Sequence, residues 1–191
     1  MEDYPLAVLG AGTMGRGIAQ VAALVGHPVM LYDFAEKNTR DAIEFIGQRL
    51  EDSFHKGKIT ENIKEQVIKN IKPVHELSEL INAKLIIEAV IEDFEIKQDL
   101  LCRVESVVGE TSILSTNTSS LDLKKISAKL KRADRFIGIH FFNPVPVMAL
   151  VEIINTDETD TNITKFVSKL VKKWGKIPVH VRNSSGFIVN R

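Results

Sequence analysis

The chain has 191 residues, of which 44% are hydrophobic and 26% are charged. This length supports one hydrophobic core and is short for two ordinary domains, so we expect a single globular domain. Its 25 basic residues balance 25 acidic ones, which leaves no net charge to recruit nucleic acid or an acidic membrane. We therefore expect a small-molecule partner, with no nucleic acid and no membrane.

Cysteine content and the first residues indicate the compartment. Cys102 is the single cysteine, so no intramolecular disulfide can form, and Met1-Glu2-Asp3 lacks the pattern of a signal peptide. The longest charge-free runs, residues 17–32 and 136–151, are interrupted by Gly, Pro, His and Asn and do not suit a bilayer span. We expect a soluble protein of the cytoplasm or another reducing interior compartment, with no metal site.

The first elements along the chain alternate strand and helix. Residues 6–9 and 29–32 are short apolar runs, and residues 14–25 between them are rich in Ala, Ile, Leu and Val, which is typical of a parallel βαβ unit. Residues 35–71 break this rhythm, because apolar side chains recur there at helical spacing around a turn at residues 55–58. We interpret this segment as a helical hairpin inserted into the fold.

The α/β alternation resumes at residue 85. Strands are predicted at residues 85–90, 113–115, 136–141, 150–154 and 177–181, and helices at about 94–108, 122–131 and 161–174. Residues 1–183 are thus predicted to form an α/β domain, a Rossmann-like doubly wound parallel sheet with a helical hairpin and an antiparallel strand extension. Ligands in such sheets bind beyond the carboxyl ends of the strands. Residues 184–191 look like a loop that enters an apolar helix, the start of a linker to a further domain.

A glycine motif follows the first predicted strand. Gly10-Ala11-Gly12-Thr13-Met14-Gly15 matches G-x-G-x-x-G between a strand and a helix. In that motif the first glycine makes a tight turn, the second lets the backbone approach a pyrophosphate, and the third lets helix and strand pack closely. The helix N-terminus then offers free N–H groups to the phosphates. The hexapeptide alone is also compatible with an ordinary strand–helix turn.

An acidic residue strengthens the prediction of a dinucleotide site. Asp33 ends the second strand, 23 residues after Gly10, where a carboxylate accepts hydrogen bonds from the adenosine ribose hydroxyls. The same carboxylate repels a 2′-phosphate, and Phe34 and Ala35 supply no arginine to offset it. The order of strand, glycines, helix, strand and acid therefore favours NAD over NADP.

Two further clusters follow strands at the expected ligand edge. Glu92 and Lys97 follow the strand at residues 85–90, where they would face the nicotinamide-side ribose or simply be surface charge. Residues 115–120 place several hydroxyls after the next strand, and Ser119 could donate to a substrate oxygen. Ser, Thr and Asn also dominate loops and N-caps, so residue chemistry leaves both alternatives open for each cluster.

One of the five histidines has a carboxylate in a pairing position. His140 ends a predicted strand, and Asn143-Pro144 and Pro146 stiffen the turn toward the strand that carries Glu152. Imidazole titrates near neutral pH, as a base that removes a hydroxyl proton must, and a carboxylate behind it fixes its tautomer. The pair predicts a site that oxidises a secondary alcohol with a nicotinamide, although Glu152 could instead be an ordinary strand-edge carboxylate.

The predicted helical hairpin has a basic turn, His55-Lys56-Gly57-Lys58, at its tip. This turn could attract a polyphosphate. An exposed turn also carries such charge for solubility alone, and residue chemistry favours that second alternative.

Together these segments resemble the N-terminal, NAD-binding half of L-3-hydroxyacyl-CoA dehydrogenases, including the 3-hydroxybutyryl-CoA dehydrogenase branch. The matching segments follow the family's order along essentially the whole chain: residues 10–19, 88–92, 115–121, 140–148, 150–152 and 186–191. The resemblance implies an oxidoreductase that converts (S)-3-hydroxyacyl-CoA to 3-oxoacyl-CoA reversibly with NAD, in fatty-acid β-oxidation or butanoate-type metabolism.

The resemblance also implies roles for individual residues. His140 is expected to be the catalytic base in oxidation and the acid in reduction, with Glu152 orienting it. Substrate contacts are implied for Ser119, Asn143 and Asn190, and the hairpin matches the region that contacts coenzyme A, with Lys56 as the candidate there. Cofactor contacts are implied for Gly10, Ala11, Gly12, Thr13, Met14, Gly15, Asp33, Glu92, Lys97, Ser119 and Asn143.

The sequence departs from the family in one large respect. The family carries a second, all-helical domain after the position of Arg191, which completes the acyl pocket and forms the dimer. We expect the chain to lack it, so that a separate helical partner chain could supply it. Two other interpretations stay open: a related dehydrogenase of a polar hydroxy acid such as a sugar acid, and a non-catalytic NAD-binding module.

Overall fold

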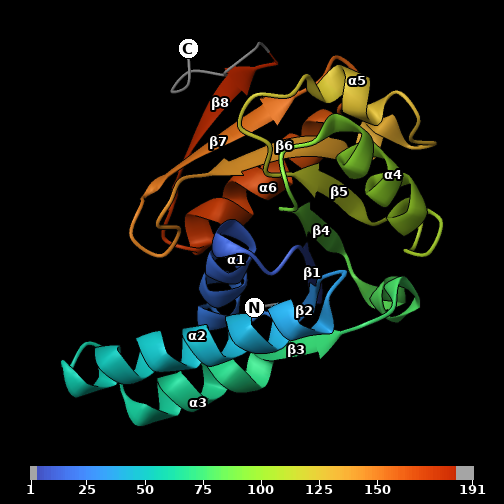
Figure 1. Cartoon of the computed structure of the whole chain (residues 1–191). Helices are drawn as coiled ribbons and strands as arrows, with labels where there is room; N and C mark the ends of the chain where they lie inside the picture. The colour runs from blue at the N-terminus through green and yellow to red at the C-terminus, as the bar shows by residue number, and fades with distance from the viewer. Residues whose placement is uncertain (1–3, 184–191) are drawn as a thin grey trace.

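The structure is a computed structural model that describes residues 4–183 of the chain. Within these residues, eight strands form one sheet in the order β3-β2-β1-β4-β5-β6-β7-β8 (Figure 1). The strands are β1 (Leu6–Leu9), β2 (Val29–Tyr32), β3 (Ile71–Val74), β4 (Leu85–Glu88), β5 (Ile113–Thr116), β6 (Phe136–Phe141), β7 (Leu150–Asn155) and β8 (Ile177–Arg182). Neighbours from β3 to β6 run parallel, β7 runs antiparallel to β6, and β8 runs parallel to β7. This confirms the predicted doubly wound α/β fold with an antiparallel extension.

Helices cover both faces of the sheet, and two of them project beyond one edge of it. They are α1 (Thr13–Leu24), α2 (Glu36–His55), α3 (Glu61–Asn70), α4 (Phe94–Glu105), α5 (Leu123–Ser127) and α6 (Thr161–Lys173), with 3-10 helices η1 (Leu77–Asn82) and η2 (Ala133–Arg135). In Figure 1, α2 and α3 lie side by side and project beyond the sheet, and Lys64 of α3 is 2.9 Å from Glu51 of α2. They occupy the segment in which the sequence predicts a helical hairpin. Across residues 4–183, no helix has the length and apolar character needed to cross a membrane.

Alternate residues of β1 belong to two hydrophobic cores, one on each face of the sheet. Leu6 and Val8 pack in the core that contains α1 and α6, whereas Ala7 and Leu9 pack in the core that contains α4 and α5. All four residues are fully buried, as expected for a parallel strand covered on both faces. The chain order reverses between β1 and β4, which creates the switch point beside which ligands of such sheets bind.

Two elements differ from the sequence prediction. β3 occupies residues assigned to the end of the hairpin and the following connection, and it pairs with β2 at the edge of the sheet. Pro73 of β3 has no N–H to donate to a neighbouring strand, which is tolerated at the edge of a sheet. Because proline usually indicates a break in a strand, the sequence pattern did not predict β3. The helix predicted at residues 122–131 ends early, at Ser127, whose hydroxyl donates back to the Lys124 carbonyl and competes with the helical pattern.

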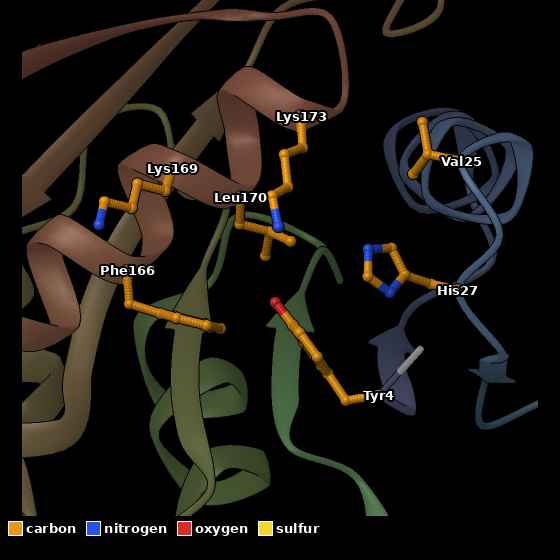
Figure 2. Close-up of a pocket in the computed structure, with 7 residues that line it drawn as sticks. All are labelled: Tyr4, Val25, His27, Phe166, Lys169, Leu170 and Lys173. Carbon is orange, nitrogen blue, oxygen red and sulfur yellow. The ribbon is translucent and has the colours of Figure 1, made fainter. Parts of the chain in front are cut away.

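A mostly apolar cavity of about 330 Å³ lies at the amino-terminal ends of the strands (Figure 2). Tyr4, which precedes β1, and His27, which precedes β2, line one side of it, and Phe166 and Leu170 of α6 line the other. Ligands of doubly wound sheets bind at the carboxyl ends of the strands, so this cavity is separate from the expected ligand edge.

Candidate active site

The turn between β1 and α1 has the geometry of a phosphate cradle. Gly10 has φ +98°, which favours glycine, and a Cβ on Gly15 would lie only 1.7 Å from the Gly10 carbonyl oxygen. Gly12 faces open space, because a Cβ placed on it would have no atom within 4 Å. It is the N-cap of α1 and places no side chain over the first N–H groups. The turn therefore leaves room and backbone donors for a pyrophosphate, which fits a dinucleotide.

Asp33 lies directly beside this turn. Its Oδ2 accepts a hydrogen bond from the Ala11 N–H (2.8 Å), and its Oδ1 accepts one from the Asn38 side chain (2.9 Å). Asn38 was not predicted from the sequence, because no spacing rule places α2 against the end of β2. Arg16 lines the same cleft, of about 650 Å³, but its guanidinium stacks on Phe45 at 3.7 Å. Asp33 thus remains the charged group best placed for a ribose.

His140 and Glu152 are opposite each other on the antiparallel strands β6 and β7. The two atoms that join them, His140 Nδ1 and Glu152 Oε2, are 2.7 Å apart. His140 is 5% exposed and Glu152 is 1% exposed, so the pair lies in a low-dielectric setting where its attraction is strong. The Phe142 ring packs 4.4 Å from the imidazole. The structure therefore brings together the two residues that the sequence pairs.

A second cleft, of about 360 Å³, continues from the first, because Met14, Ala89 and Val90 line both. It is lined at its other end by Glu92, Lys97, Asn117, Ser119, His140, Phe141, Phe142 and Asn143. One continuous surface at the carboxyl ends of β1, β4, β5 and β6 therefore joins the glycine turn to the His140–Glu152 pair.

Lys56 lies away from this cleft. Lys56 is exposed and caps the C-terminus of α2. The turn between α2 and α3 lies at the end of the helical pair away from the sheet (Figure 1). Asn190 lies outside the described residues.

Glu92, in the loop after β4, binds the turn at residues 118–120. Its Oε1 accepts hydrogen bonds from the Thr118 hydroxyl (2.5 Å) and the Ser119 N–H (2.8 Å). Burial raises the pKa of the Glu92 carboxyl, but these bonds and the charge of Lys97 outweigh it and hold the pKa below its ordinary value. Glu92 therefore stays an ionised acceptor that fixes Ser119 in the cleft. Lys97 is 1% exposed, so it is not the surface charge that one alternative predicted.

Asn117 is a site residue that the sequence did not single out. Its Oδ1 accepts the N–H of Phe141 at 2.8 Å and so ties the end of β5 to the end of β6, next to His140. Asn117 stands among the hydroxyl residues at 115–120, but which of these side chains turns toward β6 depends on the strand pairing.

The fold, the glycine turn and the carboxylate after β2 define a dinucleotide-binding domain. Residues 5–184 match the family model described as 3-hydroxyacyl-CoA dehydrogenase, NAD binding domain, and the chain belongs to this family. NAD is therefore the cofactor of the domain.

Individual relatives agree with this assignment. The chain is 41% identical over 186 residues to 3-hydroxyadipyl-CoA dehydrogenase of Escherichia coli, and 39% identical over 186 residues to 3-hydroxybutyryl-CoA dehydrogenase of Clostridioides difficile. These alignments cover 97% of the chain but 39% and 66% of the two relatives. The crystal structure of (S)-3-hydroxybutyryl-CoA dehydrogenase from Ralstonia eutropha superposes with a TM-score of 0.96 at 40% identity, over 100% of this chain and 67% of that one. The chain thus spans well under half of the first relative.

Proposed function

We propose that the protein is an NAD-dependent dehydrogenase that interconverts (S)-3-hydroxyacyl-CoA and 3-oxoacyl-CoA. The observation that carries this proposal is the buried His140–Glu152 pair at one end of a continuous cleft whose other end is the glycine turn. The names of the relatives support the substrate class, because they act on 3-hydroxyadipyl-CoA and 3-hydroxybutyryl-CoA.

The proposed chemistry assigns the proton to His140. The glycine turn and Asp33 would hold NAD, which would supply the acceptor for the hydride from carbon 3 of the substrate. His140 takes the hydroxyl proton at Nε2, while its Nδ1–H donates to Glu152, which fixes the tautomer and stabilises the imidazolium that forms. In the reverse direction the imidazolium returns the proton to the oxygen. A positioned acid–base residue of this kind contributes roughly 100- to 10,000-fold in rate.

Other residues of the cleft orient the reactants in this proposal. Glu92 holds the Ser119 N–H, and the Ser119 hydroxyl turns from Glu92 to the substrate oxygen when substrate binds. Asn143 donates a hydrogen bond to the substrate oxygen or to the nicotinamide side of the cofactor. Asn190 is proposed as a further substrate contact. Lys56 is proposed to meet the phosphates of coenzyme A, which its exposure at the end of α2 permits.

We further propose that an additional helical segment or chain completes the acyl pocket and forms the dimer. Val147 is 75% exposed and Met148 is 39% exposed in the loop between β6 and β7, just beyond His140. Large apolar side chains grouped at the mouth of a site favour a covering surface. The relatives are longer than this chain, which also supports such a segment.

The test is the reduction of acetoacetyl-CoA by NADH, monitored as the decrease in absorbance of the reduced nicotinamide. His140→Gln should lower kcat by about 100-fold or more without weakening NADH binding, because it removes the proton donor alone. His75→Gln is the matched control, since His75 lies at an exposed turn before η1, and it should retain full activity. Free acetoacetate should be a poor substrate. If free acetoacetate is reduced as fast as acetoacetyl-CoA, or if the His140→Gln variant is as active as wild type, the proposal is contradicted.

A further inference from the structure

Glu88, at the end of β4, is a fully buried carboxylate that accepts three hydrogen bonds. Its Oε1 accepts from Lys97 Nζ at 2.6 Å and from the Val90 N–H at 2.7 Å, and its Oε2 accepts from the Thr116 hydroxyl at 2.6 Å. Its exposed fraction is 0%. Burial raises the pKa of Glu88, and the charge of Lys97 acts against that shift. A buried carboxylate is costly unless it is paired and hydrogen-bonded in this way.

Lys97 transmits this interaction toward the cleft. Its ammonium has three protons and three close acceptors: Glu88 Oε1 at 2.6 Å, the Val90 carbonyl at 3.2 Å and Glu92 Oε2 at 3.3 Å. Lys97 therefore lies between two carboxylates, one buried and one facing the cleft. Its position relative to Glu92 depends on the stronger, shorter contact with Glu88.

Two routes lead from Glu88 to the turn that holds Ser119. The first passes through Lys97 to Glu92, whose Oε1 accepts the Ser119 N–H at 2.8 Å and the Ser119 hydroxyl at 3.2 Å. The second passes through Thr116, whose hydroxyl oxygen accepts the Thr118 N–H at 3.2 Å. Both routes join β4 and β5 at their carboxyl ends, beneath the reactive end of the cleft.

We propose that Glu88 is a positioning residue that fixes the Ser119 hydroxyl through Lys97, Glu92 and Thr116. Glu88 does not line the cleft, so it acts only through these neighbours. When Glu88 loses its charge, Lys97 loses its nearest partner and moves closer to Glu92. Glu92 then no longer accepts the Ser119 N–H, and the Ser119 turn is released. The catalytic consequence rests on the proposed function, in which Ser119 contacts the substrate; the structural coupling does not.

The first experiment therefore needs no turnover. Amide hydrogen exchange is measured by NMR in Glu88→Gln, which keeps the shape but removes the charge. The Ser119 amide should exchange about tenfold faster than in wild type, because its acceptor Glu92 is displaced. Glu110→Gln, the same substitution at an exposed position, should leave it unchanged. Thr116→Val removes one donor to Glu88 and keeps the side-chain shape, so the Ser119 amide should again exchange faster than in wild type. This variant replaces Glu88→Gln in the experiment if Glu88→Gln does not fold. Ser119 exchange equal to wild type in the folded variants would overturn the proposal.

The second experiment is a double-mutant cycle on acetoacetyl-CoA reduction. If Glu88 acts through Ser119, Glu88→Gln should lower kcat about tenfold alone and less than about twofold in a Ser119→Ala background. Because Lys97 and Glu92 are also expected to contact the cofactor, any weakening of NADH binding by Glu88→Gln should be the same in both backgrounds. A merely structural role would lower kcat by the same factor in both, which would contradict the proposal. Faster Ser119 exchange in a protein with no dehydrogenase activity would preserve the coupling and refute the proposed function instead.

Discussion

Gly12→Ala is expected to separate cofactor binding from folding. Gly12 has φ −69° and ψ −168°, which any residue adopts, and a Cβ there meets no atom within 4 Å. Replacing glycine by alanine at such a position stabilises a fold by about 0.4–1 kcal/mol, because the unfolded chain loses freedom. The new methyl group would occupy the space through which a pyrophosphate approaches the backbone. Loss of one charge-assisted hydrogen bond there, about 1.5–3 kcal/mol, weakens NADH binding roughly 10- to 150-fold.

Urea unfolding and NADH fluorescence titration measure the two effects on the same protein. Gly47→Ala, in α2, is the matched control, because its Cβ would lie 3.8 Å from Ile68 Cδ1, an ordinary contact. It should stabilise the fold by about 0.5–1 kcal/mol and leave the NADH affinity unchanged. If Gly12→Ala binds NADH as tightly as wild type, the pyrophosphate does not lie over this turn.

Three further perturbations test other parts of the structure. Asp33→Asn should weaken NADH binding about tenfold and narrow the preference over NADPH, because one charge-assisted acceptor is lost; an unchanged NADH:NADPH ratio of Kd values would contradict this. Glu152→Gln should lower kcat/KM about tenfold or more with an unchanged NADH Kd, since a neutral acceptor stabilises the imidazolium less; steady-state rates equal to wild type would exclude the pairing role. Tyr4→Phe tests alkaline stability. Burial raises the pKa of Tyr4, so the unfolded chain loses this proton first and the free energy of unfolding falls as pH rises above about 10. Urea titrations at pH 9 and 11 should show that the free energy of unfolding falls less in Tyr4→Phe than in wild type, with a difference of at most about 1.4 kcal/mol per pH unit. An identical fall in both proteins would contradict the raised pKa of Tyr4.

Elements with strong local signals were predictable from the sequence. The apolar run of β1 and the glycine turn after it specify a strand, a turn and a helix start within a few residues. The pairing of His140 with Glu152 was suggested by the sequence, because a turn between two apolar runs can bring them together, and the register observed between β6 and β7 places the two residues opposite each other. β3 was missed, since Pro73 reads as a break and its pairing depends on β2, which lies about 40 positions earlier in the chain.

Residues that depend on distant partners were not predictable. Glu88 occurs in a segment that matches the family, yet nothing in that segment shows that its carboxylate meets Lys97 and Thr116 inside the protein. Asn117 has the same character, because its role requires β6 to lie next to β5. The sequence located the ligand edge, and tertiary packing determined which polar groups support it.

Transfer of a labelled hydride in a single turnover shows whether the protein is a 3-hydroxyacyl-CoA dehydrogenase. The protein, in excess over NADH deuterated at the transferred position, is mixed with acetoacetyl-CoA, and the product is analysed by mass spectrometry and for its configuration. We expect (S)-3-hydroxybutyryl-CoA with one deuterium on carbon 3, formed about 100-fold more slowly by His140→Gln. A protein that, together with its helical segment, binds NADH yet transfers no deuterium would contradict the proposed function, and so would a His140→Gln variant that transfers deuterium at the wild-type rate.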